Sequence, residues 1–281
     1  MIKSMINPIF IILLFGIFAS CGEAVTKKTQ AKPNKKEVNS LSKNVKYIDS
    51  LVEPSGLKIK WAFKGKGGPI ERGDVILINY VVTLPNGKLV DGNSKITKSD
   101  LPFMVGYNMQ TKGWDEAILA MQVGDVATIV IPAELGRSDR ALGDVLPANA
   151  DNLLQIHVVK KVKPAIVENG AKIWRWSLKK NEKTDLSFGP GKTIKFHLLA
   201  NSSKEAGIIN THAKNMLISN RFEDEITPKS LKKALTNAKK GQGIFMLLTS
   251  SEIAQIKGLD RKLNSDESLF YTIQVVDVLA K

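Results

Sequence analysis

The sequence predicts an α+β protein with two tandem domains, each an antiparallel sheet with one short helix, preceded by a signal peptide and a flexible tether. Three observations support this fold class. Segments recur in the same order in the two halves of the chain. Each half combines several strand-like runs with a single helix-like segment. An apolar run and then a lysine-rich stretch precede both halves.

The amino terminus has the pattern of a secretory signal peptide over residues 1–20. Lys3 gives a positive start, Ile9–Phe18 is apolar, and two small residues follow. Such a run is too short to span a bilayer comfortably. Cys21, the only cysteine of the chain, comes next and resembles the lipobox cysteine of bacterial lipoproteins, although Phe18 stands where Leu is usual. The alternative is an ordinary signal peptide with an incidental cysteine.

Residues 21–46 are expected to form a flexible tether. This stretch contains seven Lys and two Glu and almost no large apolar residue, so it cannot bury enough surface to fold. It could contact anionic lipid head groups, or it could be a solvated spacer. The whole chain carries a formal charge of +14. Basic and aromatic residues do not alternate as they would for base stacking, which favours anionic envelope surfaces over nucleic acid.

After the tether, roughly 230 residues remain, which suits two domains better than one. Self-comparison predicts domains at 47–163 and 164–281, with chance similarity of β-rich segments as the alternative. Gly and apolar positions match in four pairs of segments: 56–61 with 170–176, 73–80 with 191–198, 117–124 with 234–241, and 152–159 with 268–276.

The strands of the first domain are predicted from runs of β-branched and aromatic residues bounded by turn residues. Val75–Thr83 is the clearest run, and Pro85-Asn86-Gly87 provides the turn after it. The other expected strands are 88–90, 102–105, 127–131 and 153–162.

One short helix is predicted around Trp114. Trp114, Ile118 and Met121 recur at helical spacing, with Ala117 beside them. Thr111 can cap the start of the helix, and two acidic residues, 115 and 116, favour its positive end. A large aromatic residue at the start of a helix could form the floor of an apolar pocket.

A set of motif positions follows in a fixed order along the first domain: Gly73-Asp74, Tyr80, Gly87, Asp91, Phe103, Gly113-Trp114, Gly124-Asp125, Ile131-Pro132, Gly143, Pro147 and Ala150. In combination, these motifs resemble the FK506-binding-protein class of peptidyl-prolyl isomerases over about residues 53–163. The resemblance implies a five-stranded antiparallel sheet wrapped around one helix, with a shallow apolar pocket between them.

The resemblance also implies the roles of individual residues. Trp114 would lie under the bound proline ring, and Tyr80, Asp91 and Phe103 would form the catalytic pocket walls. An apolar pair would contact the ligand through its backbone: Val145 and Leu146. Plain core packing is the alternative for each of these side chains, but it explains Asp91 least well because buried carboxylates need partners.

Five further positions that should contact substrate depart from the family pattern. Val90, Leu101 and Leu154 stand where aromatic residues are usual, Thr111 replaces an apolar residue, and Arg137 replaces a tyrosine. Aromatic side chains bury about 150–250 Å² each, so fewer of them should weaken ligand binding. The sequence therefore predicts weak isomerase activity and weak FK506 binding.

No metal or cofactor is expected. Rotation about an X-Pro bond faces a barrier of about 18–20 kcal/mol from amide resonance, and a dry pocket with a nearby donor can lower it without a nucleophile. The three histidines, His157, His197 and His212, are scattered along the sequence. Two of them, His157 and His197, fall within strand patterns and are expected at core or face positions.

The second domain is predicted to be a degenerate copy. Leu231 aligns with Trp114, Leu198 with Tyr80, and Asn210 lies near the position of Asp91. A helix is expected from Thr227-Pro228 onward. The pocket residues are absent, so this copy would retain the fold without the site.

The leading functional hypothesis is a lipid-anchored prolyl isomerase that acts on proline-containing unfolded or envelope polypeptides, similar to isomerase lipoproteins of Bacteroidetes-type bacteria. A non-catalytic chaperone or assembly module is the alternative, and a structural anchor on anionic envelope polymers is a third. After Cys21 comes Gly22, without the Asp that retains enteric lipoproteins at the inner membrane, which favours the outer membrane.

Overall fold

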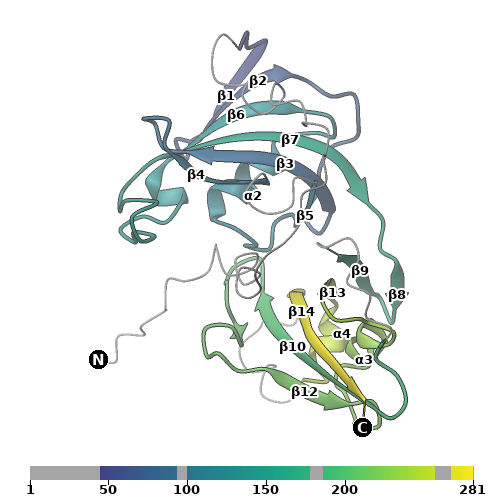
Figure 1. Cartoon of the computed structure of the whole chain (residues 1–281). Coiled ribbons are helices and arrows are strands. Elements are labelled where there is room, and N and C mark those ends of the chain that lie inside the picture. Colours follow the sequence, from purple (N-terminus) through teal and green to yellow (C-terminus); the bar gives the residue numbers. More distant parts are fainter. Residues whose placement is uncertain (1–44, 94–99, 178–185, 257–266, 281) are drawn as a thin grey trace, which may run out of the picture. The chain divides into compact units, whose positions relative to one another are not determined.

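The computed structural model describes residues 45–93, 100–177, 186–256 and 267–280. The predicted signal peptide, Cys21 and the predicted tether up to residue 44 lie outside this range. Among the described residues, the strands form two sheets (Figure 1). We call each sheet, with the helices between its strands, a module. None of the helices in the described ranges is long and apolar enough to cross a bilayer.

The first module contains a seven-stranded sheet in the order β1-β2-β6-β7-β3-β4, with β5 paired to β3. The neighbouring strands β1–β2, β2–β6, β6–β7 and β3–β4 are antiparallel. The element bounds are β1 Asp49–Val52, β2 Lys58–Phe63, β3 Val75–Thr83, β4 Leu89–Gly92, β5 Leu101–Met104, α2 Lys112–Leu119, β6 Val126–Ile131, η2 Ala133–Leu135 and β7 Asn152–Val162.

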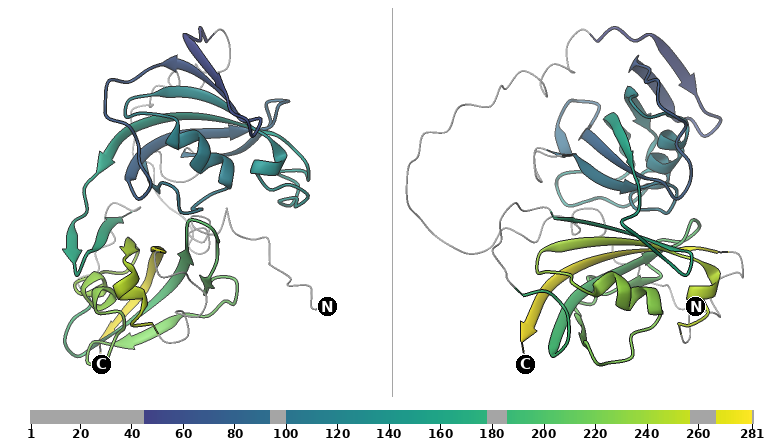
Figure 2. Two further views of the ribbon diagram at one scale, coloured as in Figure 1. Left: turned by 180° about the vertical axis from the view of Figure 1, so that it is seen from behind. Right: turned by 90° about the vertical axis from the view of Figure 1, so that its right-hand side faces the viewer.

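The sheet contributes to the core of this module through alternate side chains along its strands. In β3 every second side chain is buried, and the partly exposed residues between them face the other side of the sheet. The helix α2 lies against the sheet (Figure 2) and buries Trp114, Ala117 and Ile118. The predicted helical face is confirmed for Trp114, Ala117 and Ile118, whereas Met121 is buried two residues beyond the helix, which ends at Leu119.

The second module repeats the strand connectivity of the first. Its sheet has the order β8-β9-β13-β14-β10-β11, with β12 paired to β10. Replacing each strand by its counterpart reproduces the first sheet, including the strand that pairs off the main path. The bounds are β8 Ile166–Glu168, β9 Ala171–Ser177, β10 Lys192–Asn201, β11 Ile209–Asn210, β12 Ile218–Arg221, α3 Lys229–Leu235, β13 Gln242–Leu248, α4 Ser250–Ile253 and β14 Leu269–Ala280.

This shared topology agrees with the internal repeat seen in the sequence. The four aligned pairs of segments fall on β2 and β9, β3 and β10, α2 and α3, and β7 and β14. The change of sheet falls between Val162 and Ile166. Each half thus contains one sheet built with the same connectivity, which is what a tandem arrangement requires.

The second module departs from the expectation of a single helix, because α4 follows β13. Its residue Glu252 is fully buried and accepts hydrogen bonds from the amide and hydroxyl groups of Ser230 in α3, at 3.3 and 2.5 Å. A buried carboxylate with these donors ties the two helices together. The four residues of α4 are too few to show a helical period in the sequence.

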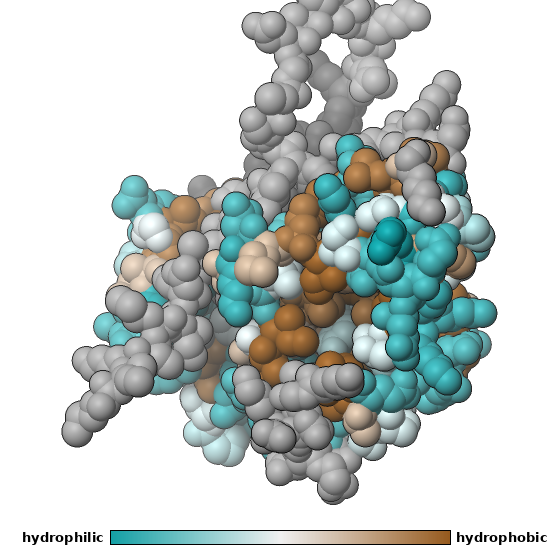
Figure 3. Space-filling model, turned by 90° about the horizontal axis from the view of Figure 1, so that it is seen from below, coloured by the Kyte–Doolittle hydropathy of each residue, from teal (hydrophilic) through white to brown (hydrophobic). Residues whose placement is uncertain are grey.

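Both cores are formed by aliphatic and aromatic residues, and α3 packs Leu231, Ala234 and Leu235 into the second one. Apolar side chains also reach the surface, as Figure 3 shows on one face. The largest exposed apolar side chains include Val52, Phe63, Val167 and Met216. Scattered exposed apolar residues are normal in soluble domains, but clusters of them can mark interaction sites.

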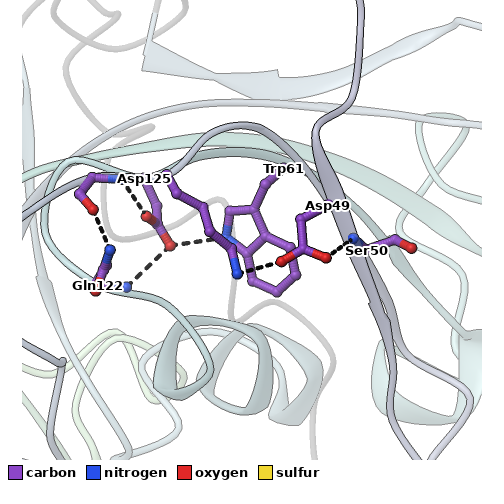
Figure 4. A network of polar contacts seen from close by, with 7 residues as sticks. Asp49, Ser50, Trp61, Gln122 and Asp125 are labelled. Atoms are coloured by element: carbon purple, nitrogen blue, oxygen red, sulfur yellow. Dashed lines mark hydrogen bonds and ion pairs between the residues drawn. The ribbon is translucent and has the colours of Figure 1, made fainter.

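A buried carboxylate organises the end of the first sheet next to α2 (Figure 4). Asp125 is only 2 % exposed. One oxygen accepts the indole N–H of Trp61 at 2.8 Å and the amide of Gln122 at 3.1 Å, and the other accepts the amide of Gly65 at 2.7 Å. The side-chain amide of Gln122 donates to the carbonyl of Gly65. One side chain therefore joins β2, the segment after it, and the turn that leads into β6.

Gly65 permits this arrangement by its lack of a side chain. A Cβ at this position would lie 2.1 Å from the carbonyl oxygen of Val123 and 2.6 Å from the Cα of Gly124. Both are backbone atoms that cannot move aside. Gly124 has a φ of +94°, which glycine adopts without strain. The two glycines let the chain segments approach closely around Asp125.

We expect Asp125→Ala to lower the free energy of unfolding by about 2–4 kcal/mol, because it leaves three N–H donors without their acceptor. Urea denaturation of the full chain measures this loss. Asp139→Ala is the matched control, since Asp139 is exposed. Equal stability of the two variants would contradict the structural role of Asp125.

Candidate functional site

Two polar residues predicted for the pocket, Tyr80 and Asp91, are hydrogen-bonded to each other. The hydroxyl of Tyr80, on β3, donates to Oδ2 of Asp91, on β4, at 2.9 Å. Burial raises the pKa of Tyr80, and the charge of Asp91 and this hydrogen bond raise it further. Tyr80 therefore remains a neutral donor at physiological pH and holds the carboxylate in a fixed orientation.

Asn93 supports this pair, although the sequence did not point to it. Its side-chain oxygen accepts the amide of Tyr80 at 2.7 Å, and its side-chain nitrogen donates to the carbonyl of Ile78 at 3.2 Å. Asn93 is buried and follows β4 directly. It thereby binds the backbone of β3 on both sides of residue 79 and fixes the start of the Tyr80 side chain.

The two aromatic residues predicted for the pocket are stacked. Phe103, on β5, and Trp114, on α2, have ring centroids 5.8 Å apart and planes inclined by 23°. Such an offset stack is a favourable aromatic geometry. Both side chains are largely buried, with 2 % and 7 % exposed. The stack forms an apolar surface where β5 meets the start of α2.

Sheet pairing relates the polar pair to the aromatic pair. β3 pairs with both β4 and β5 in the hydrogen-bonded sheet. Asp91, Tyr80 and Phe103 therefore come from three neighbouring strands, and Trp114 joins them through its contact with Phe103.

The segment between β5 and α2 is held by Asp115, a second acidic residue whose role the sequence did not reveal. Its two oxygens accept the amides of Gly106 and Asn108, each at 2.8 Å. Burial raises the pKa of Asp115, and these two amides and the charge of Arg72 oppose that rise. Asp115 lies in the first turn of α2, as predicted, and it also fixes the chain leading to Trp114.

The loop after β6 carries three of the predicted contact residues. Arg137 is largely buried, and its Nε donates to the carbonyl of Arg140 at 3.4 Å. Burial and the neighbouring charge of Arg140 lower the pKa of Arg137. Val145 is half-buried and Leu146 is buried. The loop is joined to the β3–β4 turn, because Nζ of Lys88 donates to the carbonyl of Asp144 at 2.6 Å.

The remaining predicted contact residues differ in how accessible they are. Val90 and Leu101 are buried on β4 and β5, and Thr111 is half-buried before α2. Leu154, on β7, has no exposed surface. A ligand at the surface would therefore meet Leu154 only through the side chains that cover it.

The second module lacks both pairs at the corresponding elements. Leu198 is buried on β10 and Leu231 is buried on α3, at the positions that align with Tyr80 and Trp114. Asn210, on β11, accepts the amide of Ala213 at 3.1 Å. Buried leucines at both positions offer apolar packing but neither a phenol donor nor an indole surface.

Two histidines that appeared scattered in the sequence meet in the second module. The rings of His197 and His212 stack with centroids 4.0 Å apart and planes inclined by 24°. Nδ1 of His197 lies 3.1 Å from the hydroxyl of Thr211, whereas Nδ1 of His212 is buried without a hydrogen-bond partner. Within the described ranges, no group of three or more His, Cys, Asp or Glu residues could hold a metal ion.

Comparison with known proteins shows which family the first module is similar to. Residues 67–159 match the family model described as FKBP-type peptidyl-prolyl cis-trans isomerase. FK506-binding protein 1A of Neurospora crassa is 33 % identical over 111 residues, which cover 39 % of this chain and 92 % of that protein. FK506-binding protein 2 of Kluyveromyces lactis is 31 % identical over 114 residues, 41 % of this chain and 75 % of that protein.

A bacterial relative matches a longer part of the chain. Outer membrane protein MIP of Legionella longbeachae is 27 % identical over 145 residues, which cover 49 % of this chain and 61 % of that protein.

Because of the buried histidine pair, we expect the second module to lose folding stability in acid. Burial, and then the charge of His197, lower the pKa of His212 to about 4, against an ordinary value of 6.5. The folded state thus resists protonation that the unfolded state accepts. Stability from this group is complete above pH 6.5 and is lost as the pH falls toward 4.

Urea midpoints across this range should decline, and His212→Gln should flatten the decline. His157→Gln, the control, should leave it unchanged; a decline that survives His212→Gln would contradict this assignment.

Proposed function

Because the chain belongs to the family of FKBP-type peptidyl-prolyl cis-trans isomerases, we propose that its first module isomerises X-Pro bonds in polypeptides of the bacterial cell envelope. The observation that carries the proposal is the Phe103–Trp114 stack, which joins α2 to β5, a strand paired with the strand of Tyr80 and its partner Asp91. Clients would be unfolded or envelope polypeptides with accessible prolines.

The proposed mechanism is rotation without covalent chemistry. The indole of Trp114 would support the proline ring, and Phe103 would extend that apolar surface. In a dry site the twisted amide, whose nitrogen is no longer conjugated with the carbonyl, is less disfavoured than in water. The Tyr80–Asp91 pair would supply a fixed polar group beside the rotating bond. Uncatalysed rotation takes about 10–100 s, so a modest stabilisation is useful.

We propose further that the activity is weaker than is usual for the family. Val90, Leu101 and Leu154 offer less contact area than aromatic residues would. Leu154 is also fully covered. Arg137 places a cation where the family has a phenol hydroxyl. The second module, with leucines at both aligned positions, would be a degenerate copy without isomerase activity.

The central test is an isomerase assay of the full chain on a proline peptide with Trp114→Leu. We expect kcat/KM to fall at least about tenfold, because the ring surface under the proline is lost. Trp176→Leu is the matched control, since Trp176 also packs on a phenylalanine, Phe245, with ring centroids 4.0 Å apart. This variant should retain the activity.

The same variants separate the isomerase from the chaperone alternative. If Trp114→Leu affects only the refolding of proline-free clients, the module acts as a chaperone. No turnover in the unsubstituted chain would refute the enzyme, and turnover at the full rate of the family would refute the weakening.

We also propose a lipid anchor at Cys21 in the outer membrane, on the basis of the amino-terminal pattern and of the relative named outer membrane protein MIP. In a bacterial host that processes lipoproteins, Cys21→Ser should abolish incorporation of radiolabelled fatty acid and move the protein from the membrane to the soluble fraction. Ser20→Ala, which keeps a small residue before the cysteine, is the control. Labelling that persists in Cys21→Ser would contradict the assignment.

A further inference from the structure

The β1–β2 hairpin presents an outer face whose composition the isomerase site does not explain. In the antiparallel register, Val52 lies opposite Lys58 and Ser50 lies opposite Lys60. Directly opposite residues share one face of a sheet. Leu51 instead pairs with Ile59, which is fully buried and faces the core. Val52, Ser50, Lys58 and Lys60 therefore point away from the core.

Large apolar side chains on this hairpin are exposed rather than buried. Val52 is 65 % exposed, Ile48, just before β1, is 59 % exposed, and Phe63, at the end of β2, is 55 % exposed. Phe63 pairs with Val126, the neighbour of the buried Ala127, so Phe63 also lies on the outer face. Three such side chains around one hairpin form an apolar patch, which a solvated surface does not require.

Positive charge is concentrated on the same segment. Residues 45–66 contain five Lys and two acidic residues, a net charge of +3. Residues 67–163, the rest of the predicted isomerase domain, contain ten Lys and Arg against eleven Asp and Glu. Lys64 is paired with Asp49. Lys58 and Lys60 are exposed on the outer face beside the apolar patch.

We propose that the outer face of this hairpin, made of Ile48, Ser50, Val52, Lys58, Lys60 and Phe63, docks on a bilayer of anionic phospholipid. Aliphatic and phenyl groups can enter the boundary between head groups and acyl chains, while lysines extend their charged ends to the phosphates. Anionic lipid surfaces attract such clusters of basic residues.

Continuity along the chain favours a bilayer over an acidic protein as the partner. The sequence that precedes the hairpin, residues 22–44, has six Lys and two Glu and leads back to the proposed anchor at Cys21. The docking inference rests on the proposed function only for the lipid anchor at Cys21. A chain anchored at one end meets the bilayer at a high effective concentration, so even a weak contact would be populated. Docking would hold the isomerase domain in a defined orientation at the membrane.

The test uses a single thiol as a reporter. Cys21 is the only cysteine, so the full chain with Cys21→Ser can carry one fluorophore at Ser50→Cys, on the outer face. Ser219→Cys, at an exposed position of β12, is the control. With vesicles of phosphatidylcholine and phosphatidylglycerol, emission from position 50 should shift to the blue, and emission from position 219 should not. Phosphatidylcholine alone should give no shift. This vesicle-binding experiment requires neither isomerase activity nor lipidation of the protein.

Charge variants identify the surface. Lys58→Glu with Lys60→Glu should reduce the bound fraction at least about fivefold, whereas Lys112→Glu with Lys160→Glu, which makes the same change in net charge at exposed positions, should retain binding. Equal loss in both double variants would overturn the proposal, because it would indicate a general charge effect. An unchanged spectrum at position 50, or the same shift with soluble polyglutamate, would overturn it as well.

Discussion

The buried carboxylate of Asp125 is the interaction on which the first module depends. It accepts bonds from Trp61 on β2, from Gly65 and from Gln122, and thus joins the second strand to the turn between α2 and β6. A buried acceptor with three donors is stabilising only while every donor is in place. Because that turn follows α2 directly, its position also determines how the helix that carries Trp114 lies on the sheet.

The second module also joins its second strand to the end of its helix, but through a positively charged side chain. Gly124 aligns with Gly241, so Ala127 on β6 corresponds to Ile244 on β13. Trp61 pairs with Ala127, and Arg175 pairs with Ile244. Arg175 therefore occupies in the second module the position that Trp61 has in the first. Arg175 donates to the carbonyls of Lys233, Ala234 and Thr236 at the end of α3, at 2.8–3.1 Å. The carbonyl end of a helix attracts a cation. Both modules thus connect their second strand to the end of their helix, one through a carboxylate and the other through a guanidinium.

This common scaffold separates residues needed for packing from residues available for function. The shared connectivity persists with Leu231 in α3 and Leu198 in β10. The aromatic stack and the phenol–carboxylate pair are therefore not general requirements of the fold. Their restriction to the module that matches the isomerase family is the strongest reason to assign them to a site. The exposed apolar and basic residues of the β1–β2 hairpin lie outside that site and suggest a second task, contact with the membrane.

The sequence by itself determined the α+β class, the bounds of β3, the buried face of α2 and the repeat, because strand and helix periods and turn residues are local properties. It also identified Tyr80, Asp91, Phe103 and Trp114 through a family resemblance. Only the tertiary structure revealed the roles of Asn93, Asp115 and Asp125 and the stacked pair of His197 and His212. Trp61 lies 64 residues from its partner Asp125, whereas the partners of Asp115 lie only 7 and 9 residues away, but no helix or strand period encodes either pairing. The outward direction of Val52 and Phe63 likewise depends on how the strands pair, which register decides.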